Sequence, residues 1–189
     1  MKKKAVAVVM TAVMALGMVS AVSVQAGIED KTLIVGFDAE YPPYGYMDES
    51  GEYTGFDLEL AQAVCDLEGW ELEKKPINWD SKDMELNSGS IDCIWNGFTM
   101  NGREDDYTFS EPYVDNSQVI VVADDSGIEK LTDLAGKTVG VQAASAALDL
   151  LQSEEEGGQK ELADTFGALN EFADYNTAFT ELQAGALDA

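Results

Sequence analysis

The sequence predicts an α/β fold with a mainly parallel sheet. Short apolar runs of strand length alternate along the chain with longer segments whose apolar residues recur at helical spacing. The first series has the order hairpin, helix, strand, helix, strand, and a second βα series begins after residue 127. Strands that alternate with helices in this way are typical of an α/β layer.

The first half of the chain supplies the first series. In chain order we expect a strand at 32–37, a hairpin at 45–55, a helix at 57–69, a strand at 70–79, a short helix ending near 89 and a strand at 91–95. Asp57 is a plausible N-cap and Gly69 a stop for the first helix. The apolar face of that helix is expected to hold Leu60, Ala61, Val64, Cys65 and Leu67.

The second half continues the pattern. We expect a strand at 118–123 that leads away from the first series, a short turn at 132–136, a strand at 137–142, a helix at 145–156, a strand at 169–172, a helix at 177–184 and the opening of another strand at 187. Gly185 is the expected C-terminal stop of the last helix. No internal repeat is visible.

The N-terminal segment 1–26 reads as a signal peptide. Lys2, Lys3 and Lys4 form a positive start, an uncharged apolar stretch follows, and small residues precede a cut after Ala26. An uncleaved membrane anchor is the alternative, because the uncharged run is long enough to span a bilayer. Either reading places the rest of the chain outside the cytoplasm, in the periplasm or at the cell exterior.

Composition excludes several classes of function. The formal net charge of −25 argues against nucleic acid and against anionic membrane surfaces as partners. The absence of histidine removes Ser-His-Asp and Cys-His catalysis and His-ligated metal sites. We therefore expect no catalytic residues, no metal and no cofactor. Cys65 and Cys93 are compatible with one disulfide or with two separately buried thiols.

The stretch 91–113 carries the clearest site signal. A buried strand runs out into Asn96, Gly97 and Thr99, and Arg103 follows at a turn or helix start. Small ligands bind at the carboxyl ends of strands in open α/β sheets. A guanidinium is the strongest polar anchor for a carboxylate. These residues predict a receptor for a small zwitterion.

Aromatic residues lie on the same expected rim. Tyr41 and Trp79 follow the ends of two predicted strands, and Asp38 lies beside Tyr41. Each aromatic alone is equally typical of core packing. Together with Asp38 they favour a pocket with aromatic walls and a few polar groups.

Five segments in this order resemble the family 3 extracellular solute-binding proteins, which deliver polar amino acids to ABC importers. They are VGFDAEYPPYGY (35–46), GFDLELAQAV (55–64), IDCIWNGFTMNGRE (91–104), FSEPY (109–113) and DLAGKTVGVQAASAALDLL (133–151). The resemblance covers 31–189. It implies the two-lobe, type II periplasmic-binding-protein fold, in which α/β lobes joined by a hinge close around the ligand.

The resemblance also implies a site and partners. Asp38, Tyr41 and Trp79 would line the side-chain pocket, Asn96, Gly97 and Thr99 would meet polar groups, Arg103 would hold the α-carboxylate, and Gln142, Ser145 and Ala146 would close over it from the second lobe. The expected partners are an amino acid and an ABC transporter permease, and we expect a monomer. Asp38 suits a basic side chain, but related binders of neutral polar amino acids carry an Asp there too.

The chain departs from the family pattern in three places. The spacing from Thr99 to Arg103 is one residue shorter than usual, and Ala144 stands where a glycine is typical. The family pattern also continues past a segment like 187–189, so we expect a second lobe, and a return to the first lobe, that are incomplete here. The expected divisions are 1–26 signal peptide, 27–117 lobe 1, 118–123 hinge strand and 124–189 partial lobe 2. We expect weak or no ligand binding by 27–189 alone.

Two other functions compete with importer delivery. One is the ligand-sensing module of a membrane receptor, which requires a membrane segment beyond residue 189. The other is a periplasmic enzyme on the same fold, since some dehydratases and cell-wall lyases resemble this family. No nucleophile–base pair is visible in the sequence, so we expect binding without chemistry.

Overall fold

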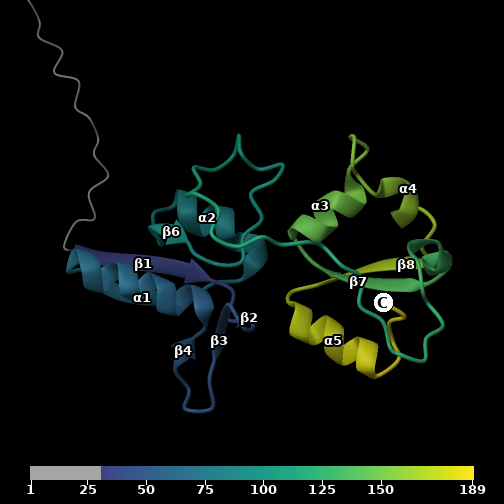
Figure 1. Cartoon of the computed structure of the whole chain (residues 1–189), viewed down its shortest axis with the longest axis horizontal. Helices are drawn as coiled ribbons and strands as arrows, with labels where there is room; N and C mark the ends of the chain where they lie inside the picture. The colour runs from purple at the N-terminus through teal and green to yellow at the C-terminus, as the bar shows by residue number, and fades with distance from the viewer. Residues whose placement is uncertain (1–30) are drawn as a thin grey trace, which may run out of the picture.

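Two lobes lie side by side in the structure, a computed structural model that describes residues 31–189 (Figure 1). The predicted signal segment 1–26 lies outside the described residues. Lobe 1 contains strands β1 to β6 with helices α1 and α2, and lobe 2 contains β7, β8 and helices α3 to α5. Residues 114–123, called the link below, join the last part of lobe 1 to lobe 2.

Lobe 1 is built on a parallel three-stranded sheet in the order β5-β1-β6, with an antiparallel β2-β3-β4 meander beside it. Its elements are β1 (Thr32–Phe37), β2 (Glu40–Tyr41), β3 (Gly45–Met47), β4 (Tyr53–Thr54), α1 (Phe56–Glu68), β5 (Glu71–Pro76), a 3-10 turn (Trp79–Ser81), α2 (Lys82–Asn87) and β6 (Cys93–Ile94). The predicted alternation of strands and helices with a parallel sheet is therefore confirmed.

Lobe 2 repeats the βα pattern around two parallel strands, β7 and β8. Its elements are a 3-10 turn (Leu131–Leu134), β7 (Thr138–Gln142), α3 (Ala146–Gln152), α4 (Lys160–Ala163), β8 (Ala168–Phe172) and α5 (Tyr175–Gln183). Residues 187–189 run beside β7, where the Asp188 amide donates to the Thr138 carbonyl at 2.8 Å. No strand is formed at 187–189, so the strand expected to open at Leu187 is not observed.

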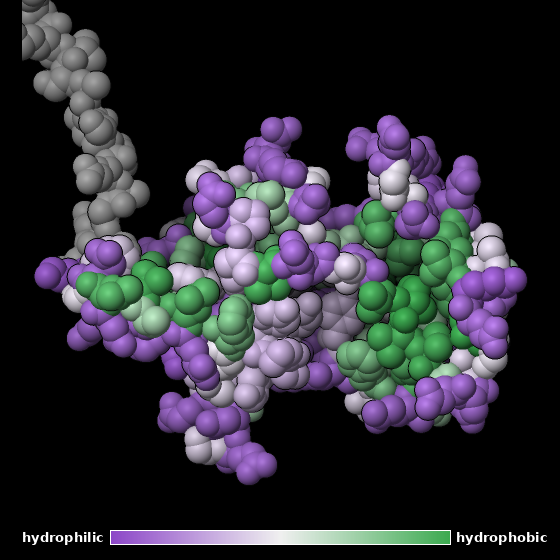
Figure 2. Space-filling view, in the orientation of Figure 1, coloured by the Kyte–Doolittle hydropathy of each residue, from purple (hydrophilic) through white to green (hydrophobic). Residues whose placement is uncertain are grey.

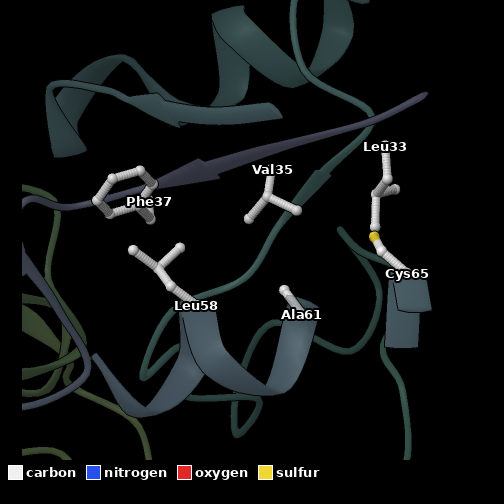
Figure 3. Close-up of a cluster of buried hydrophobic side chains, with 6 residues drawn as sticks. All are labelled: Leu33, Val35, Phe37, Leu58, Ala61 and Cys65. Carbon is white, nitrogen blue, oxygen red and sulfur yellow. The ribbon is translucent and has the colours of Figure 1, made fainter. Parts of the chain in front are cut away.

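The core of lobe 1 lies between β1 and α1. Leu33, Val35 and Phe37 alternate along β1 and point toward Leu58, Ala61 and Cys65 on the facing side of α1 (Figure 3). Helix α1 ends as predicted at Gly69, whose left-handed φ of 69° closes the last turn. This packing fixes the carboxyl end of β1, and hence Asp38, relative to the rest of the lobe.

Two details of α1 correct the sequence prediction. The N-cap is Gly55, and Asp57 lies inside the first turn, fully buried and bonded to the Tyr113 hydroxyl at 2.7 Å. Leu67 is 85% exposed, so it does not belong to the apolar face. The buried residues Leu58, Ala61 and Cys65 recur every three or four positions, and Leu67 falls off that stripe.

The predicted strand 118–123 is wrong. The link has no regular structure, because no described strand lies beside it to form a ladder. Val119, Ile120 and Val121 are partly or largely exposed and line a groove of about 350 Å³ with apolar residues of lobe 2. Figure 2 shows the apolar surface gathered on this side of lobe 2.

The predicted helix 145–156 is also too long. Helix α3 ends at Gln152, and the chain turns before the short α4, which the sequence analysis did not anticipate. Glu154, Glu155 and Glu156 come after Ser153, the C-cap of α3. Acidic side chains are unfavourable at the negative C-terminal end of a helix, so they do not extend α3.

Both cysteines are free thiols that pack in the lobe 1 core. Cys65 is fully buried on α1, and Cys93 is half-buried on β6. Burial raises the pKa of the Cys93 thiol to about 11, which keeps it protonated and unreactive at neutral pH.

Candidate functional site

The carboxyl ends of strands from both lobes meet at one cavity. Strands β1 and β6 bring residues 38–41 and 96–99 from lobe 1, and β7 brings residues 142–146 from lobe 2. The cavity has a volume of about 40 Å³, and it is lined by Tyr41, Trp79, Asn96, Gly97, Phe98, Thr99, Arg103, Gln118, Gln142, Ser145, Ala146 and Tyr175. The ends of the strands, where small ligands bind in open α/β sheets, thus surround a cavity between the lobes.

Nine of the ten residues selected from the sequence line this cavity, and Asp38 lies next to them. Phe98, Gln118 and Tyr175 line it as well and were not selected. Tyr175 follows the carboxyl end of β8, so the strand-end rule would have found it. Gln118 lies in the link, where no local pattern marks it.

Asp38 is a buried carboxylate that joins the two lobes. It accepts hydrogen bonds from the Glu40 amide at 2.9 Å and from Gln142 Nε2 at 2.7 Å, and its own amide donates to Asn96 Oδ1 at 3.1 Å. Burial raises the pKa of the Asp38 carboxyl, and the two donated hydrogen bonds oppose that shift. The Asp38 carboxylate, which lies next to the cavity, is therefore oriented by hydrogen bonds from both lobes.

Arg103 is the only arginine in the sequence, and it points across the cleft to lobe 2. Its Nη2 donates to Asp149 Oδ2 at 2.5 Å and to the Ala144 carbonyl at 3.4 Å. The guanidinium also lies 5.0 Å from the centre of the Phe98 ring, which supports it from below as a cation–π contact. The Arg103 side chain is only 10% exposed, and Asp149 is 59% exposed.

Aromatic rings form two further walls. Tyr41 stacks on Tyr44 with a centroid distance of 5.6 Å and approaches Tyr175 of lobe 2 at 6.3 Å. On the other side, Trp79 meets Phe98 edge-to-face at 5.4 Å. Rings placed in this way can cover both faces of a small ligand's apolar part.

Gly97 and Ser145 have local roles that explain their residue types. A Cβ at Gly97 would lie 3.0 Å from the Tyr41 ring, so glycine permits the close approach of that strand end. The Ser145 hydroxyl caps α3 by accepting from the Leu148 amide at 3.2 Å. Ala146 is the first residue of α3, and Thr99 accepts from Asn116 of the link at 3.3 Å.

The described residues contain neither a cluster of metal ligands nor a membrane-spanning helix. Between residues 31 and 189, no group of three or more His, Cys, Asp or Glu side chains is placed to hold a metal ion. No helix in the same range is long and apolar enough to cross a membrane.

The profile of the bacterial extracellular solute-binding proteins, family 3, matches residues 33–189. The chain belongs to this family. Family membership confirms the resemblance found in the sequence. The family's two-lobe, type II α/β fold is likewise confirmed by the solved structures that match it.

Among curated solute-binding relatives, the arginine-binding extracellular protein ArtP of Bacillus subtilis is 38% identical over 138 residues. That match covers 72% of this chain and 51% of ArtP, so the chain spans about half the length of this relative. The L-cystine-binding protein TcyJ of Escherichia coli K12 is 32% identical over 189 residues, which covers 94% of this chain and 68% of TcyJ.

Solved structures of the family give the same picture. An ABC uptake transporter substrate-binding protein from Streptococcus pneumoniae with bound histidine has a TM-score of 0.77 and 35% identity, covering 84% of this chain and 64% of that chain. An ancestral arginine-binding protein bound to arginine has a TM-score of 0.72 and 38% identity, covering 84% and 68%. These proteins are named as binding proteins, not as enzymes.

Proposed function

We propose that this chain binds an amino acid, in particular a polar one, between its two lobes and delivers it to an ABC importer. The observation that carries the proposal is the cavity between the lobes. It is lined by aromatic side chains and by the chain's only arginine, and the buried Asp38 carboxylate lies next to it. Amino acids are the common small molecules that carry both an ammonium group and a carboxylate, and the carboxylate can pair with Arg103. The relatives named for arginine, cystine and histidine support this ligand class.

Each lining group has a proposed role. Arg103 holds the α-carboxylate, and Ser145, Ala146 and Gln142 close over it from lobe 2. Tyr41, Trp79 and Asp38 surround the side chain, and Asn96, Gly97 and Thr99 meet its polar groups. The division of the chain into 27–117, 118–123 and 124–189 remains our proposal for the lobes and the hinge between them.

Closure of the lobes is the proposed mechanism. The cavity of about 40 Å³ holds only a few water molecules, because one water needs about 10–15 Å³ on this measure. An amino acid therefore enters when the lobes separate, and the lobes then close around it. The closed form docks as a monomer on the membrane permease, outside the cytoplasm and without a cofactor.

We propose binding without chemistry. Within residues 31–189 no histidine is present, and the cavity lining contains no nucleophile paired with a base. Ser145, the one lining serine, uses its oxygen to cap α3. A structural relative with a TM-score of 0.75 is an ancestral amino-acid-binding protein described as a precursor of cyclohexadienyl dehydratase, so turnover of prephenate-like substrates is the control assay.

Titration calorimetry with a panel of amino acids tests the proposal. The titrations extend to millimolar ligand, because the incomplete second lobe predicts weak binding, or none, by 27–189. Amino-acid binding would give heat with at least one polar amino acid. That heat should be lost in Arg103→Ala, since removing one partner of a buried charge pair costs about 2–5 kcal/mol.

Lys160→Ala is the matched control. Lys160 pairs with Asp164 on the outer helix α4, so its loss removes one cation from the same protein without touching the cavity. Absence of binding by every amino acid at millimolar concentration would refute amino-acid binding by residues 27–189, and unchanged binding by Arg103→Ala would refute the proposed site.

A further inference from the structure

A carboxylate already occupies the anchor proposed for the ligand. Asp149 lies on α3, which begins on the side of lobe 2 that faces lobe 1 (Figure 1), and its Oδ2 is 2.5 Å from Arg103 Nη2. The Arg103 side chain is only 10% exposed, so the Asp149 carboxylate takes the place next to its guanidinium. The chemistry at this end of the cleft is therefore the same as that of a bound α-carboxylate, but both partners belong to the protein.

A second cation lies at the same place. Lys82 is 4% exposed, and its Nζ donates to the Ala144 carbonyl at 3.3 Å, the same oxygen that accepts from Arg103. Within residues 31–189 no carboxylate lies within salt-bridge distance of Lys82. Burial lowers the pKa of the Lys82 ammonium and the nearby Arg103 charge adds to that shift, while the charges of Asp83, Asp149 and Asp80 oppose it. Asp149 is thus the ion-pair partner of Arg103 beside a second, buried cation.

We infer that Asp149 is an internal competitor of the ligand, whose carboxylate must displace it from Arg103 before the cleft can fill. This inference rests on the proposed function, because it concerns the same anchor. An interaction made only in the unliganded protein stabilises that state, and it weakens ligand binding by the same factor. An arriving carboxylate also meets the negative charge of Asp149 next to the guanidinium.

The opposite role for Asp149 predicts an opposite result. If the Arg103–Asp149 pair persisted with ligand bound, it would lock the closed form, and its removal would weaken binding. The sign of the change in affinity therefore separates competition from a lock.

The decisive variant is Asp149→Asn, which keeps the size of the side chain and removes the charge. Under competition we expect the dissociation constant for the amino acid that binds the wild type to fall about two- to fivefold, the range that a half-exposed ion pair can supply. The gain should shrink when the salt concentration is raised, because exposed charges are screened. Unchanged or weaker binding by Asp149→Asn overturns the inference.

Asp164→Asn is the control. It also converts a paired carboxylate of lobe 2 into an amide, but its partner is Lys160 on α4, away from the cleft. The competition account requires wild-type affinity from Asp164→Asn. An equal gain in both variants would point to general charge repulsion and would also overturn the inference.

A second measurement needs no ligand. Because Arg103 is the only arginine, a sample labelled with 15N-arginine gives guanidinium resonances from this side chain alone. The ion pair should slow rotation about the Cζ–Nε bond and resolve the Nη resonances in the wild type and in Asp164→Asn. Asp149→Asn should lose that resolution. Identical spectra for wild type and Asp149→Asn overturn the inference.

The two measurements separate the inference from the proposed function. If the spectra change as expected but neither protein binds any amino acid, the internal pair is real and the proposed ligand class is wrong. In that case the inference that Asp149 competes with an amino acid is refuted as well. If amino acids bind but Asp149→Asn shows no gain in affinity, only the inference is refuted.

Discussion

Gln142 donates a hydrogen bond of 2.7 Å to the Asp38 carboxylate, and this contact joins the carboxyl ends of β7 and β1 across the two lobes. The residues are 104 positions apart in the sequence, and both are buried. Gln142 also donates to the Ala173 carbonyl at 3.1 Å, so its amide is held from two sides. A buried polar contact therefore joins the two lobes in this structure.

Replacement of Gln142 by Leu should destabilise the closed form. Leu fills a similar volume but leaves the buried Asp38 oxygen without its donor, which costs about 1–3 kcal/mol. Small-angle scattering should show a larger radius of gyration for the variant, and urea unfolding should show the lost stability. Gln152→Leu, at the exposed end of α3, serves as the control. Equal behaviour of the two variants would show that the contact does not hold the lobes.

Trp79→Ala should weaken amino-acid binding by about 1–3 kcal/mol through the loss of an aromatic wall. Trp79 is 6% exposed and contacts Phe98, so the variant also loses stability. Trp70→Ala separates the two effects, because Trp70 packs against the lobe 1 core and does not line the cavity. Calorimetry at a temperature where both variants are folded should show weaker binding only for Trp79→Ala. Equal affinities of Trp79→Ala and Trp70→Ala would show that Trp79 does not contribute to the binding site.

Ala144→Gly should stabilise the protein by about 0.5–1 kcal/mol. Ala144 has a φ of 53°, in the left-handed region that costs a residue with a Cβ about 1–2 kcal/mol, and part of the gain is offset by the greater chain entropy of glycine. Ala143→Gly is the matched control, since Ala143 has no such backbone strain, and it should be destabilising. Urea unfolding of both variants measures the difference, and a loss of stability in Ala144→Gly would contradict the prediction.

The stability of the wild type relative to Asp57→Asn should fall as the pH rises. Burial raises the pKa of the Asp57 carboxyl, and the Tyr113 hydroxyl offsets this only in part. A carboxyl with a raised folded pKa holds its proton more tightly in the folded state. Its contribution is therefore complete below the unfolded value of about 3.9, and it is lost as the pH rises through the folded pKa.

The stability of the wild type relative to Asp48→Asn should instead rise as the pH rises. Hydrogen bonds from the Ser50 hydroxyl and from backbone amides hold the pKa of the exposed Asp48 carboxyl below its usual value. Its contribution is present above the unfolded pKa and is lost as the pH falls through the folded pKa. Urea unfolding of the three proteins between about pH 3.5 and 7 measures both slopes, and parallel curves would show that neither carboxyl is perturbed.

Much of the cavity could be predicted because strand ends are visible in sequence. The apolar run before Asn96 and the charged and polar residues after it identify the end of a buried strand, and parallel strands end at the same edge. Ser145 was found for the same reason, just past β7. Gln118 was missed because it reaches the cavity from the link, where the backbone follows no periodic pattern.

The errors in the fold have a common cause. The run 118–123 has strand composition, but a strand also needs a partner with which to form hydrogen bonds. Asp57 has the residue type of an N-cap, but the chain places Gly55 there and buries Asp57 against Tyr113. In both cases residues distant in the sequence decided the outcome, through a missing partner strand for 118–123 and through a contact with Tyr113 for Asp57.

The sequence by itself determined the alternation of strands and helices, the stop of α1 at Gly69 and the rim of residues around the cavity. Periodicity and backbone conformation are encoded over a few neighbouring residues, so they can be read locally. Only the tertiary structure decided that Arg103 pairs with Asp149 and that Asp38 meets Gln142. Those pairs bring together residues from different lobes, and their geometry is set by the packing of each lobe and by the way in which the two close.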